Sequence, residues 1–307
     1  MANQNGSGTA TRVRRNNSTE TKASMPTDAE AEEEAEETTE AEDYMSRPTP
    51  YYDKDGITIY CGDNVEVLRT FDADSIDLTV TSPPYDNLRT YGGHSWDFEG
   101  VAQQLWRVMK PGGVVVWVVA DATVDGSETG TSFRQALRFK EIGFRLHDTM
   151  IWEKPEPAFY DPRRYGAVFE YMFVLSNGEP NTFDPILKQN VTAGNKLGAT
   201  YKRNSSGVSV VSVANEGKRR NKYGAIRNVW YVINNDNSRH PACFPEALAR
   251  DHILSWSNEG DVVLDCFNGS GTTTKMARAM GRRGIGIEIN RDYCEIAANR
   301  LRQKVLF

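Results

Sequence analysis

The chain lacks any apolar run long enough to cross a membrane. A membrane helix needs roughly 18 or more consecutive apolar residues, and the apolar runs here are much shorter. The N-terminal stretch also lacks the short apolar core of a secretory signal peptide. We therefore expect a cytoplasmic protein without a membrane partner.

Cysteine is scarce, and its spacing excludes the common cysteine-based sites. The four cysteines, Cys61, Cys243, Cys266 and Cys294, form no Cys-x-x-Cys pair. Such scattered cysteines fit reduced intracellular thiols better than a disulfide framework or a zinc site. We therefore expect no metal site.

Negative charge is concentrated at the N-terminus. The formal net charge is −6, but residues 1–45 hold 11 acidic and 4 basic side chains, which leaves the remainder at +1. A segment rich in Asn, Ser, Thr, Ala and Glu buries too little apolar area to offset its chain entropy. We predict a disordered acidic tail over 1–46, with a short exposed helix in its Glu/Ala block as the alternative. The overall acidity does not argue against a nucleic-acid partner.

From Tyr51 onward, short apolar runs alternate with amphipathic stretches, which is typical of an α/β sheet with helices on both faces. Strands are predicted at 57–60, 76–80, 114–120, 144–152, 168–175, 262–265 and 285–288. Helices are predicted at 64–71, 98–109, 133–142, 245–256, 272–280 and 291–301, the second of them ended by the Lys-Pro-Gly-Gly sequence at 110–113. The pattern predicts a doubly wound, mostly parallel sheet.

One segment departs from this alternation. Residues 181–228 are rich in Gly, Asn and Ser and hold nine basic residues against two acidic ones. A long insertion of this kind is usually functional or disordered. We therefore separate it from the domain that is predicted over 47–180 and 229–307.

A glycine-rich loop lies between a predicted strand and a predicted helix. Glycine lets a ligand approach the backbone closely, and Glu288 lies where doubly wound folds place an acid on ribose hydroxyls. The loop lacks the Lys of a phosphate-binding loop, so a nucleoside with a carboxylate tail fits it better than a triphosphate. A tight turn without a ligand is the alternative. The candidate ligand contacts are Asp265, Phe267, Asn268, Gly269, Ser270, Gly271, Thr272, Thr273 and Glu288.

The strand predicted at 76–80 is followed by the sequence Ser82-Pro83-Pro84-Tyr85. The two prolines stiffen the backbone and lack an N–H, so their carbonyls remain available as acceptors. The Ser82 hydroxyl and the Pro83 carbonyl offer acceptors for the two N–H groups of a planar amine, and Tyr85 offers a ring for stacking. This corner is a candidate catalytic site for a nucleobase amine, and a strand-end cap beside a core tyrosine is the alternative.

Together the two motifs resemble those of the DNA amino-methyltransferases, which use S-adenosylmethionine to methylate cytosine N4 or adenine N6. Ser82–Tyr85 matches the family's [D/N/S]-P-P-Y motif, and Asp265–Thr273 matches its cofactor motif except for a Cys in place of the usual Pro. The resemblance covers nearly all of 57–301 and implies a Rossmann-like methyltransferase fold with S-adenosylmethionine as cofactor. It also implies that Asp63 contacts the cofactor's adenine and His240 its methionine end, with a plain helix-entry role as the alternative for His240.

The order of the motifs is that of the family's β group, which is circularly permuted and carries its target-recognition region between them. Residues 181–228 occupy that position, and their positive charge suits contacts with DNA phosphates. A basic loop without a role in specificity is the alternative. The candidate DNA contacts are Arg89, Lys202, Arg203, Lys218, Arg219, Arg220 and Lys222. The resemblance implies double-stranded DNA as a partner, a monomer or homodimer, and allows for a cognate restriction endonuclease.

Four other activities are weighed against cytosine N4 methylation. Cytosine-C5 methylation usually needs a Pro-Cys pair, which the chain lacks. Ser at the first motif position favours cytosine N4, and adenine N6 is the alternative. Methylation of RNA or protein is less favoured, because protein-glutamine methyltransferases with a similar corner place their cofactor loop first. A non-catalytic DNA-binding relative is expected to lose Ser82, Tyr85 or the glycines, and all are present.

Overall fold

The structure is a computed structural model that describes residues 48–85, 96–157, 162–197, 200–212, 218–234 and 244–303. For 200–202 and 211–212, only the backbone is described. The chain divides into two units, Met1–Ser46 and Arg47–Phe307. The disordered tail predicted over 1–46 lies outside the described residues and stays a prediction.

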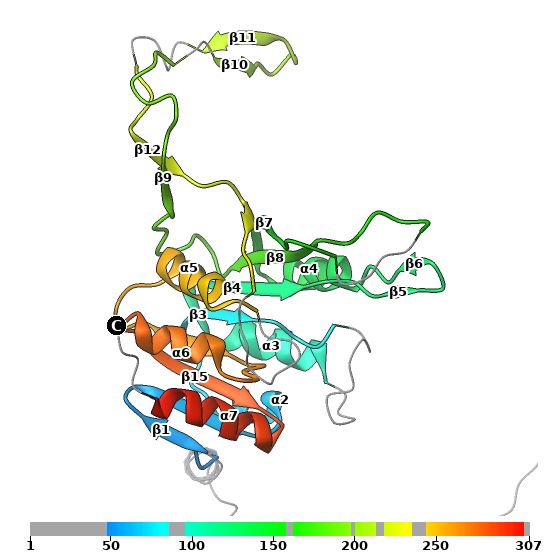
Figure 1. Cartoon of the computed structure of the whole chain (residues 1–307), viewed down its shortest axis with the longest axis vertical. Helices are drawn as coiled ribbons and strands as arrows, with labels where there is room; N and C mark the ends of the chain where they lie inside the picture. Colours follow the sequence, from blue (N-terminus) through cyan, green and yellow to red (C-terminus); the bar gives the residue numbers. More distant parts are fainter. Residues whose placement is uncertain are drawn as a thin grey trace, which may run out of the picture. The chain divides into compact units, whose positions relative to one another are not determined.

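A nine-stranded sheet forms the centre of the second unit (Figure 1). In spatial order its strands are β1 (Tyr52–Lys54), β2 (Ile57–Cys61), β15 (Arg283–Glu288), β14 (Val262–Asp265), β3 (Ile76–Thr81), β4 (Met109–Val119), β8 (Phe169–Ser176), β7 (Arg145–Glu153) and β13 (Val229–Tyr231). The pairs from β2 through β15, β14 and β3 to β4 are parallel, as is β7 with β13. The remaining three pairs are antiparallel. The prediction of a doubly wound, mostly parallel sheet is confirmed.

Helices cover both faces of this sheet. One core cluster contains side chains of α5 (Glu246–Trp256), α6 (Thr272–Ala279) and α7 (Arg291–Arg302), and another contains those of α2 (Asn64–Arg69), α3 (Phe98–Val108) and α4 (Thr131–Ile142). Val116 and Val118 of β4 belong to the first cluster, whereas Val115 and Trp117 belong to the second. Successive side chains of a strand point to opposite faces, so the continuous apolar run of β4 serves both clusters. Burial of each Val contributes roughly 1.5–3 kcal/mol.

Strand β4 begins earlier than the sequence predicts. The Lys-Pro-Gly-Gly sequence at 110–113 was expected to separate the helix from a strand at Val114, but β4 starts at Met109, directly after α3. The glycines join the sheet because Gly112 N donates to the Asn177 carbonyl at 2.5 Å. The helix-stop prediction is therefore correct for α3, and the predicted start of the strand is wrong.

Outside the large sheet, the described strands form three small antiparallel pairs. These are β5 (Thr123–Val124) with β6 (Ser127–Glu128), β9 (Leu187–Gln189) with β12 (Tyr223–Ala225), and β10 (Thr200–Arg203) with β11 (Ser209–Ser212). The last two pairs lie in residues 181–228. Strands β9 and β12 are largely exposed, so backbone hydrogen bonds hold this segment where apolar side chains are few.

Among the described residues, no helix has the length and apolarity that crossing a membrane requires. Within the same residues, no three His, Cys, Asp or Glu side chains are grouped to hold a metal ion.

Candidate active site

The two motifs meet at one edge of the sheet. Strands β3 and β14 are parallel neighbours, so the segments that follow them emerge at the same edge. The Thr81 hydroxyl at the end of β3 donates to Asp265 Oδ1 at the end of β14, at 2.7 Å and across 184 positions of sequence. The corner at 82–85 and the glycine loop at 266–271 therefore lie side by side.

A chain of hydrogen bonds fixes Tyr85. Its hydroxyl donates to Glu170 Oε2 at 2.5 Å and lies 2.9 Å from the Ser82 hydroxyl. Glu170 is only 7% exposed, and its other carboxylate oxygen pairs with Lys154 Nζ. A tyrosine has one hydroxyl proton, and here Glu170 accepts it. Ser82 is therefore the donor to Tyr85, and its own oxygen keeps lone pairs for a ligand.

Glu170 and Lys154 are site residues that the sequence analysis does not identify. Glu170 lies within β8, and Lys154 directly follows β7. A carboxylate inside an apolar strand is a usable signal, because buried acids are rare unless they are paired. The partners are not readable from the sequence, since Tyr85 and Lys154 are 85 and 16 positions away from Glu170.

The glycine loop passes close to α7. Gly269 N donates to Glu288 Oε2 at 2.8 Å, which ties the loop to the end of β15. Gly271 has a φ of +81°, in the left-handed region, and a Cβ at this position would lie 2.8 Å from the Ala297 Cβ. Only glycine allows this backbone conformation and this approach together.

Asp265 lies beneath the loop rather than on its surface. It is 1% exposed, and its Oδ1 accepts hydrogen bonds from the Thr81 hydroxyl and from Phe267 N, the latter at 3.1 Å. Burial raises the pKa of Asp265 to about 6, although these hydrogen bonds favour the charged form. Asp265 is one of the predicted ligand contacts, and in this structure its side chain supports the loop from inside.

Glu288 ends β15 beside the loop, and its side chain is half-buried. Its Oε1 accepts from Asn290 N and its Oε2 from Gly269 N, each at 2.8 Å. Burial raises the pKa of Glu288, these N–H groups oppose that effect, and the charge of Asp265 adds to it. Each carboxylate oxygen has a further lone pair, so Glu288 can also accept hydrogen bonds from ligand hydroxyls.

Other predicted contacts in the loop hold it in place. The hydroxyls of Ser270 and Thr272 accept from the Arg300 guanidinium at 2.8 and 3.3 Å. The Thr273 hydroxyl donates to a β3 carbonyl at 3.0 Å. Asn268 is 3% exposed. These buried polar side chains therefore shape the loop from inside.

Asp63 lies shortly after the end of β2, beside Glu288. Gly62 N donates to the Glu288 carbonyl at 3.0 Å. Asp63 caps α2, because its Oδ1 accepts from Val65 N at 2.9 Å and from Glu66 N at 3.1 Å. The cap fixes this carboxylate within the same corner as Glu288.

Phe267 forms part of an aromatic wall. Its half-buried ring packs edge-to-face on Trp96 with 5.0 Å between ring centroids, and Trp117 lies 6.2 Å away. Two further predicted contacts, His240 for the cofactor and Arg89 for DNA, lie outside the described residues.

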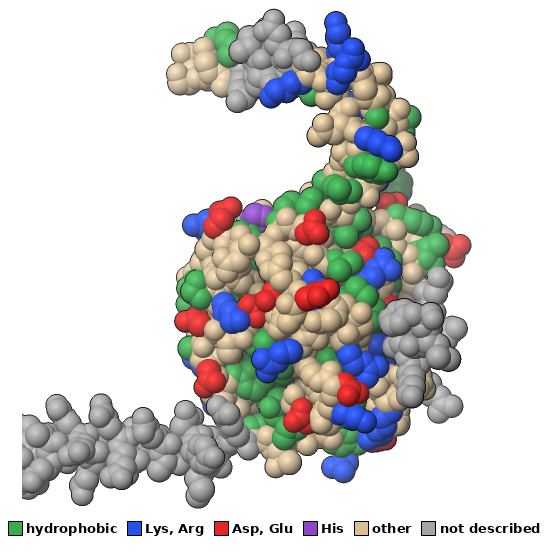
Figure 2. Space-filling model, turned by 90° about the vertical axis from the view of Figure 1, so that its left-hand side faces the viewer, with side chains coloured by type: hydrophobic (Ala, Val, Ile, Leu, Met, Phe, Trp, Pro, Cys, Tyr) green, Lys and Arg blue, Asp and Glu red, His purple; other side chains and the backbone are tan. Residues whose placement is uncertain are grey.

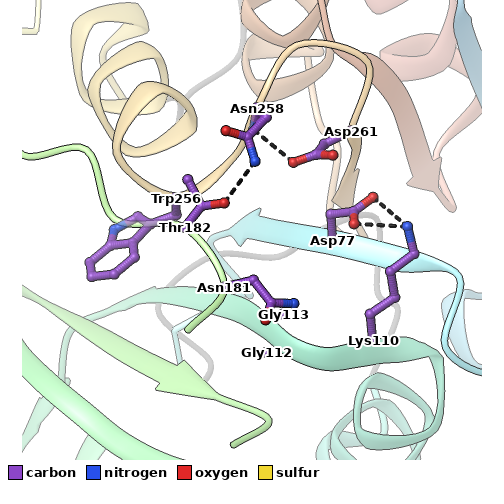
Figure 3. A pocket seen from close by; sticks show the side chains of 9 residues that line it. All are labelled: Asp77, Lys110, Gly112, Gly113, Asn181, Thr182, Trp256, Asn258 and Asp261. Atoms are coloured by element: carbon purple, nitrogen blue, oxygen red, sulfur yellow. Dashed lines mark hydrogen bonds and ion pairs between the residues drawn. The ribbon is translucent and has the colours of Figure 1, made fainter. Parts of the chain in front are cut away.

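A cavity of about 210 Å³ lies at the opposite edge of the sheet (Figure 3). Its walls include the Asp77–Lys110 ion pair at 2.8 Å, and Asn258, whose amide donates to the Thr182 hydroxyl at 2.8 Å. Asp77 lies near the amino end of β3, whereas Ser82 follows its carboxyl end. The cavity is therefore separate from the two motifs, and its Thr182–Asn258 contact ties the start of the insertion to the turn before β14.

Basic side chains are exposed along the insertion, as Figure 2 shows at the top of its view. Those described are Lys188, Lys196, Arg203, Lys218, Arg219, Arg220, Lys222 and Arg227. Residues 218–220 line a cavity of about 470 Å³ together with Tyr223, and Lys222 Nζ lies 5.4 Å from the Tyr223 ring centroid. The side chain of Lys202 lies outside the described residues.

Comparisons with known sequences agree with this geometry. Residues 76–299 match the family N6_N4_Mtase, which is described as DNA methylase. The chain is 50% identical over 242 residues to the orphan methyltransferase M.BamHII of Bacillus amyloliquefaciens, covering 76% of this chain and 91% of that protein. It is 30% identical over 249 residues to the type II methyltransferase M.BglII of Bacillus subtilis, covering 78% of this chain and 67% of that protein.

Solved structures share the fold. The PvuII DNA methyltransferase, which is named cytosine-N4-specific, has a TM-score of 0.61, covers 85% of this chain and 91% of its own, and is 22% identical. M1.HpyAVI, solved as a complex with S-adenosylmethionine, has a TM-score of 0.54, covers 80% of this chain and 99% of its own, and is 23% identical.

Fold, motifs and sequence relatives together define a DNA methyltransferase with a Rossmann-like fold. The chain belongs to the N6/N4 amino-methyltransferase family, whose methyl donor is S-adenosylmethionine. The resemblance that the two motifs indicate is thereby confirmed.

The buried carboxylate of Asp265 makes stability depend on pH. Burial raises its pKa from 3.8 to about 6, so the folded protein holds this proton more tightly than the unfolded chain. The resulting stabilisation is fully present below about pH 4 and is lost as the pH rises through about 6. We expect the free energy of unfolding of the wild type to fall relative to Asp265→Asn by about 2–3 kcal/mol between about pH 4 and 7. Urea unfolding across this range measures the difference.

The control for this prediction is Asp292→Asn, an exposed change on α7. Parallel pH profiles for the wild type and Asp265→Asn would contradict the prediction.

Proposed function

We propose that this chain transfers a methyl group from S-adenosylmethionine to the N4 amine of cytosine in double-stranded DNA. The observation that carries the proposal is the hydrogen-bond chain from Ser82 through Tyr85 to Glu170. It leaves acceptor lone pairs on Ser82 next to a glycine loop that suits a nucleoside cofactor.

The corner around Glu288 fits the adenosyl part of the cofactor. Gly269 and Gly271 let a ligand approach the backbone, and the Glu288 carboxylate offers acceptors for ribose hydroxyls. We assign Asp63 to the adenine and His240 to the methionine end, as the family resemblance implies. When bound, the cofactor supplies an electrophilic methyl group.

Ser82, Pro83 and Tyr85 are assigned to the base. An exocyclic amine is a poor nucleophile, because its lone pair is delocalised into the ring. The Ser82 hydroxyl and the Pro83 carbonyl accept its two N–H groups, Pro84 keeps the backbone rigid, and Tyr85, held by Glu170, stacks on the ring. Positioning and electrostatics supply most of the acceleration, once the base has left the duplex. The amine attacks in line, and its proton passes to solvent or to Ser82.

Cytosine N4 is favoured by Ser82 at the first motif position, since the cytosine ring nitrogen can help to carry away the proton. Adenine N6 is the second candidate target. In its favour, the chain is 29% identical over 257 residues to the DNA adenine methyltransferase YhdJ of Escherichia coli (strain K12), which covers 80% of this chain and 82% of that protein.

We assign target recognition to residues 181–228 and catalysis to 47–180 with 229–307. Exposed Lys and Arg side chains in the insertion suit the sequence-independent contacts with phosphates that position a protein on DNA. Residues 218–220 line one cavity together, so they are the first candidates for such contacts. A homodimer and a cognate restriction endonuclease are both compatible with this assignment.

The product identifies both the enzyme class and the target base. Unmodified DNA is incubated with the enzyme and isotopically labelled S-adenosylmethionine, digested to nucleosides and analysed by mass spectrometry. We expect labelled N4-methylcytosine. Labelled N6-methyladenine would establish the second candidate, and label in 5-methylcytosine alone, or no labelled nucleoside with any DNA, would refute the proposal.

The substitution Ser82→Ala tests whether Ser82 acts in the methyl-transfer step without contributing to cofactor binding. Ser82→Ala removes one acceptor for the base amine, so we expect turnover to fall by about 10²-fold or more while the affinity for S-adenosylhomocysteine is kept. Single-turnover kinetics and calorimetry measure the two quantities. Tyr85→Phe is the matched variant: it keeps the ring for stacking but removes the hydroxyl bonded to Glu170, so a smaller loss is expected. Wild-type turnover in Ser82→Ala would remove this residue from the mechanism.

The role of Glu288 is tested by binding alone. Glu288→Gln keeps the size of the side chain and removes the charge that strengthens hydrogen bonds from ribose hydroxyls. We expect S-adenosylhomocysteine to bind about 10-fold more weakly or worse, as the loss of about 1.4 kcal/mol implies. The control is Glu141→Gln, an exposed glutamate near the end of α4. Unchanged affinity in a folded Glu288→Gln protein would exclude the ribose contact.

A further inference from the structure

Two cysteines flank Glu288 at the carboxyl edge of the sheet. Cys61 ends β2 and lies opposite Glu288 in the parallel ladder between β2 and β15. Cys294 lies in the first turn of α7, and its thiol donates to the Glu288 backbone carbonyl at 3.4 Å. One residue of the proposed cofactor site is therefore bordered by two thiols.

Both cysteines lie on the face of the sheet that α7 covers. Ile57 and Ile59 of β2 pack in the same core cluster as Cys294, and side chains two positions apart on a strand share a face. Cys61, two positions after Ile59, is therefore on the side of α7. The Cys294 thiol contacts the carbonyl of Glu288, the residue that pairs with Cys61 in the ladder, so the two cysteines lie in the same corner of the structure.

The two thiols differ in their access to solvent. Cys61 is exposed, whereas Cys294 is fully buried. Burial raises the pKa of the Cys294 thiol, and the thiolate is the reactive form, so the exposed Cys61 is the thiol that meets a peroxide first. Cys266 is different, because it is buried under the glycine loop with its thiol directed at the Thr81 hydroxyl at 3.8 Å.

We propose that Cys61 and Cys294 form a site of reversible oxidation by peroxides, at which a disulfide closes and weakens cofactor binding. Cys61 sulfur attacks a peroxide oxygen, the O–O bond breaks, and Cys61 becomes a sulfenic acid while the other oxygen leaves as water with the thiol proton. Cys294 sulfur then attacks Cys61 sulfur, the S–O bond breaks, and the second water leaves with the Cys294 proton. Two thiols lose two electrons to hydrogen peroxide, and a thiol reductant reverses the reaction.

The effect on cofactor binding rests on the proposed function and follows from the position of Glu288. The disulfide removes the thiol proton that Cys294 gives to the Glu288 carbonyl and draws the first turn of α7 toward β2. Asn290, the N-cap of α7, also donates its N–H to Glu288 Oε1. A shift of this turn therefore displaces the carboxylate that we assign to the ribose.

Peptide mapping tests the site without any reference to activity. The full chain is treated with hydrogen peroxide, alkylated, digested without reductant and analysed by mass spectrometry. We expect a disulfide-linked peptide pair containing Cys61 and Cys294, which disappears with dithiothreitol and is absent from Cys61→Ser and from Cys294→Ala. Cys243→Ser is the matched control and should keep the pair. Cys61 oxidised to sulfinic acid, or linked to another cysteine, without the expected pair would overturn the proposal.

Calorimetry with S-adenosylhomocysteine tests the consequence. We expect the oxidised wild type to bind at least about threefold more weakly than the reduced protein and to recover with dithiothreitol, whereas peroxide leaves the affinity of Cys61→Ser where it was before treatment. Equal affinity of the disulfide-linked and reduced proteins would reject the functional part. If the reduced wild type does not bind S-adenosylhomocysteine at all, the proposed function is wrong. The peptide map still shows in that case whether Cys61 and Cys294 form a disulfide.

Discussion

The candidate site depends on the hydrogen bond between Thr81 and Asp265 across the centre of the sheet. It joins the last residues of β3 and β14, and so it fixes the distance between the corner that follows one strand and the loop that follows the other. Burying a carboxylate is costly unless hydrogen bonds satisfy it. The Thr81 hydroxyl and Phe267 N supply these bonds, and burial still raises the pKa of Asp265 to about 6. The cost of burying this carboxylate therefore falls at the point where the two motifs meet.

The loop above Asp265 is held from several elements at once. Arg300 of α7 reaches Ser270, and it also pairs with Glu246 of α5 at 2.7 Å. Glu246 in turn pairs with Lys275 of α6 at 2.5 Å. Three helices thus restrain a glycine backbone that would otherwise be free to move. Preorganisation of this kind spares a site the cost of ordering itself when a ligand binds.

Most of the fold and the two motifs are readable from the sequence, because they depend on neighbours in the chain. The apolar run of β4 and the glycine loop before α6 are local signals. Glu170 is not assigned to the site, because its partners Tyr85 and Lys154 lie in other elements. The hydrogen bond of Asp265 to Thr81 is not readable from the sequence for a similar reason, because an acid beside a glycine loop looks the same whether it faces a ligand or a threonine 184 positions away. The three-residue strand β13 carries too little pattern to be predicted.

The order of the motifs along the chain matters less than the order of the strands in the sheet. Strands β14 and β15 come last in the sequence, yet they lie between β2 and β3. Cross-strand hydrogen bonds do not depend on which segment comes first, and the entropy of closing a flexible loop grows only slowly with its length. A long segment can therefore separate the two motifs at little thermodynamic cost. The described residues of 181–228 lie in that interval and are mostly exposed, so this part of the chain can change its sequence while the hydrogen bond between β3 and β14 stays as it is.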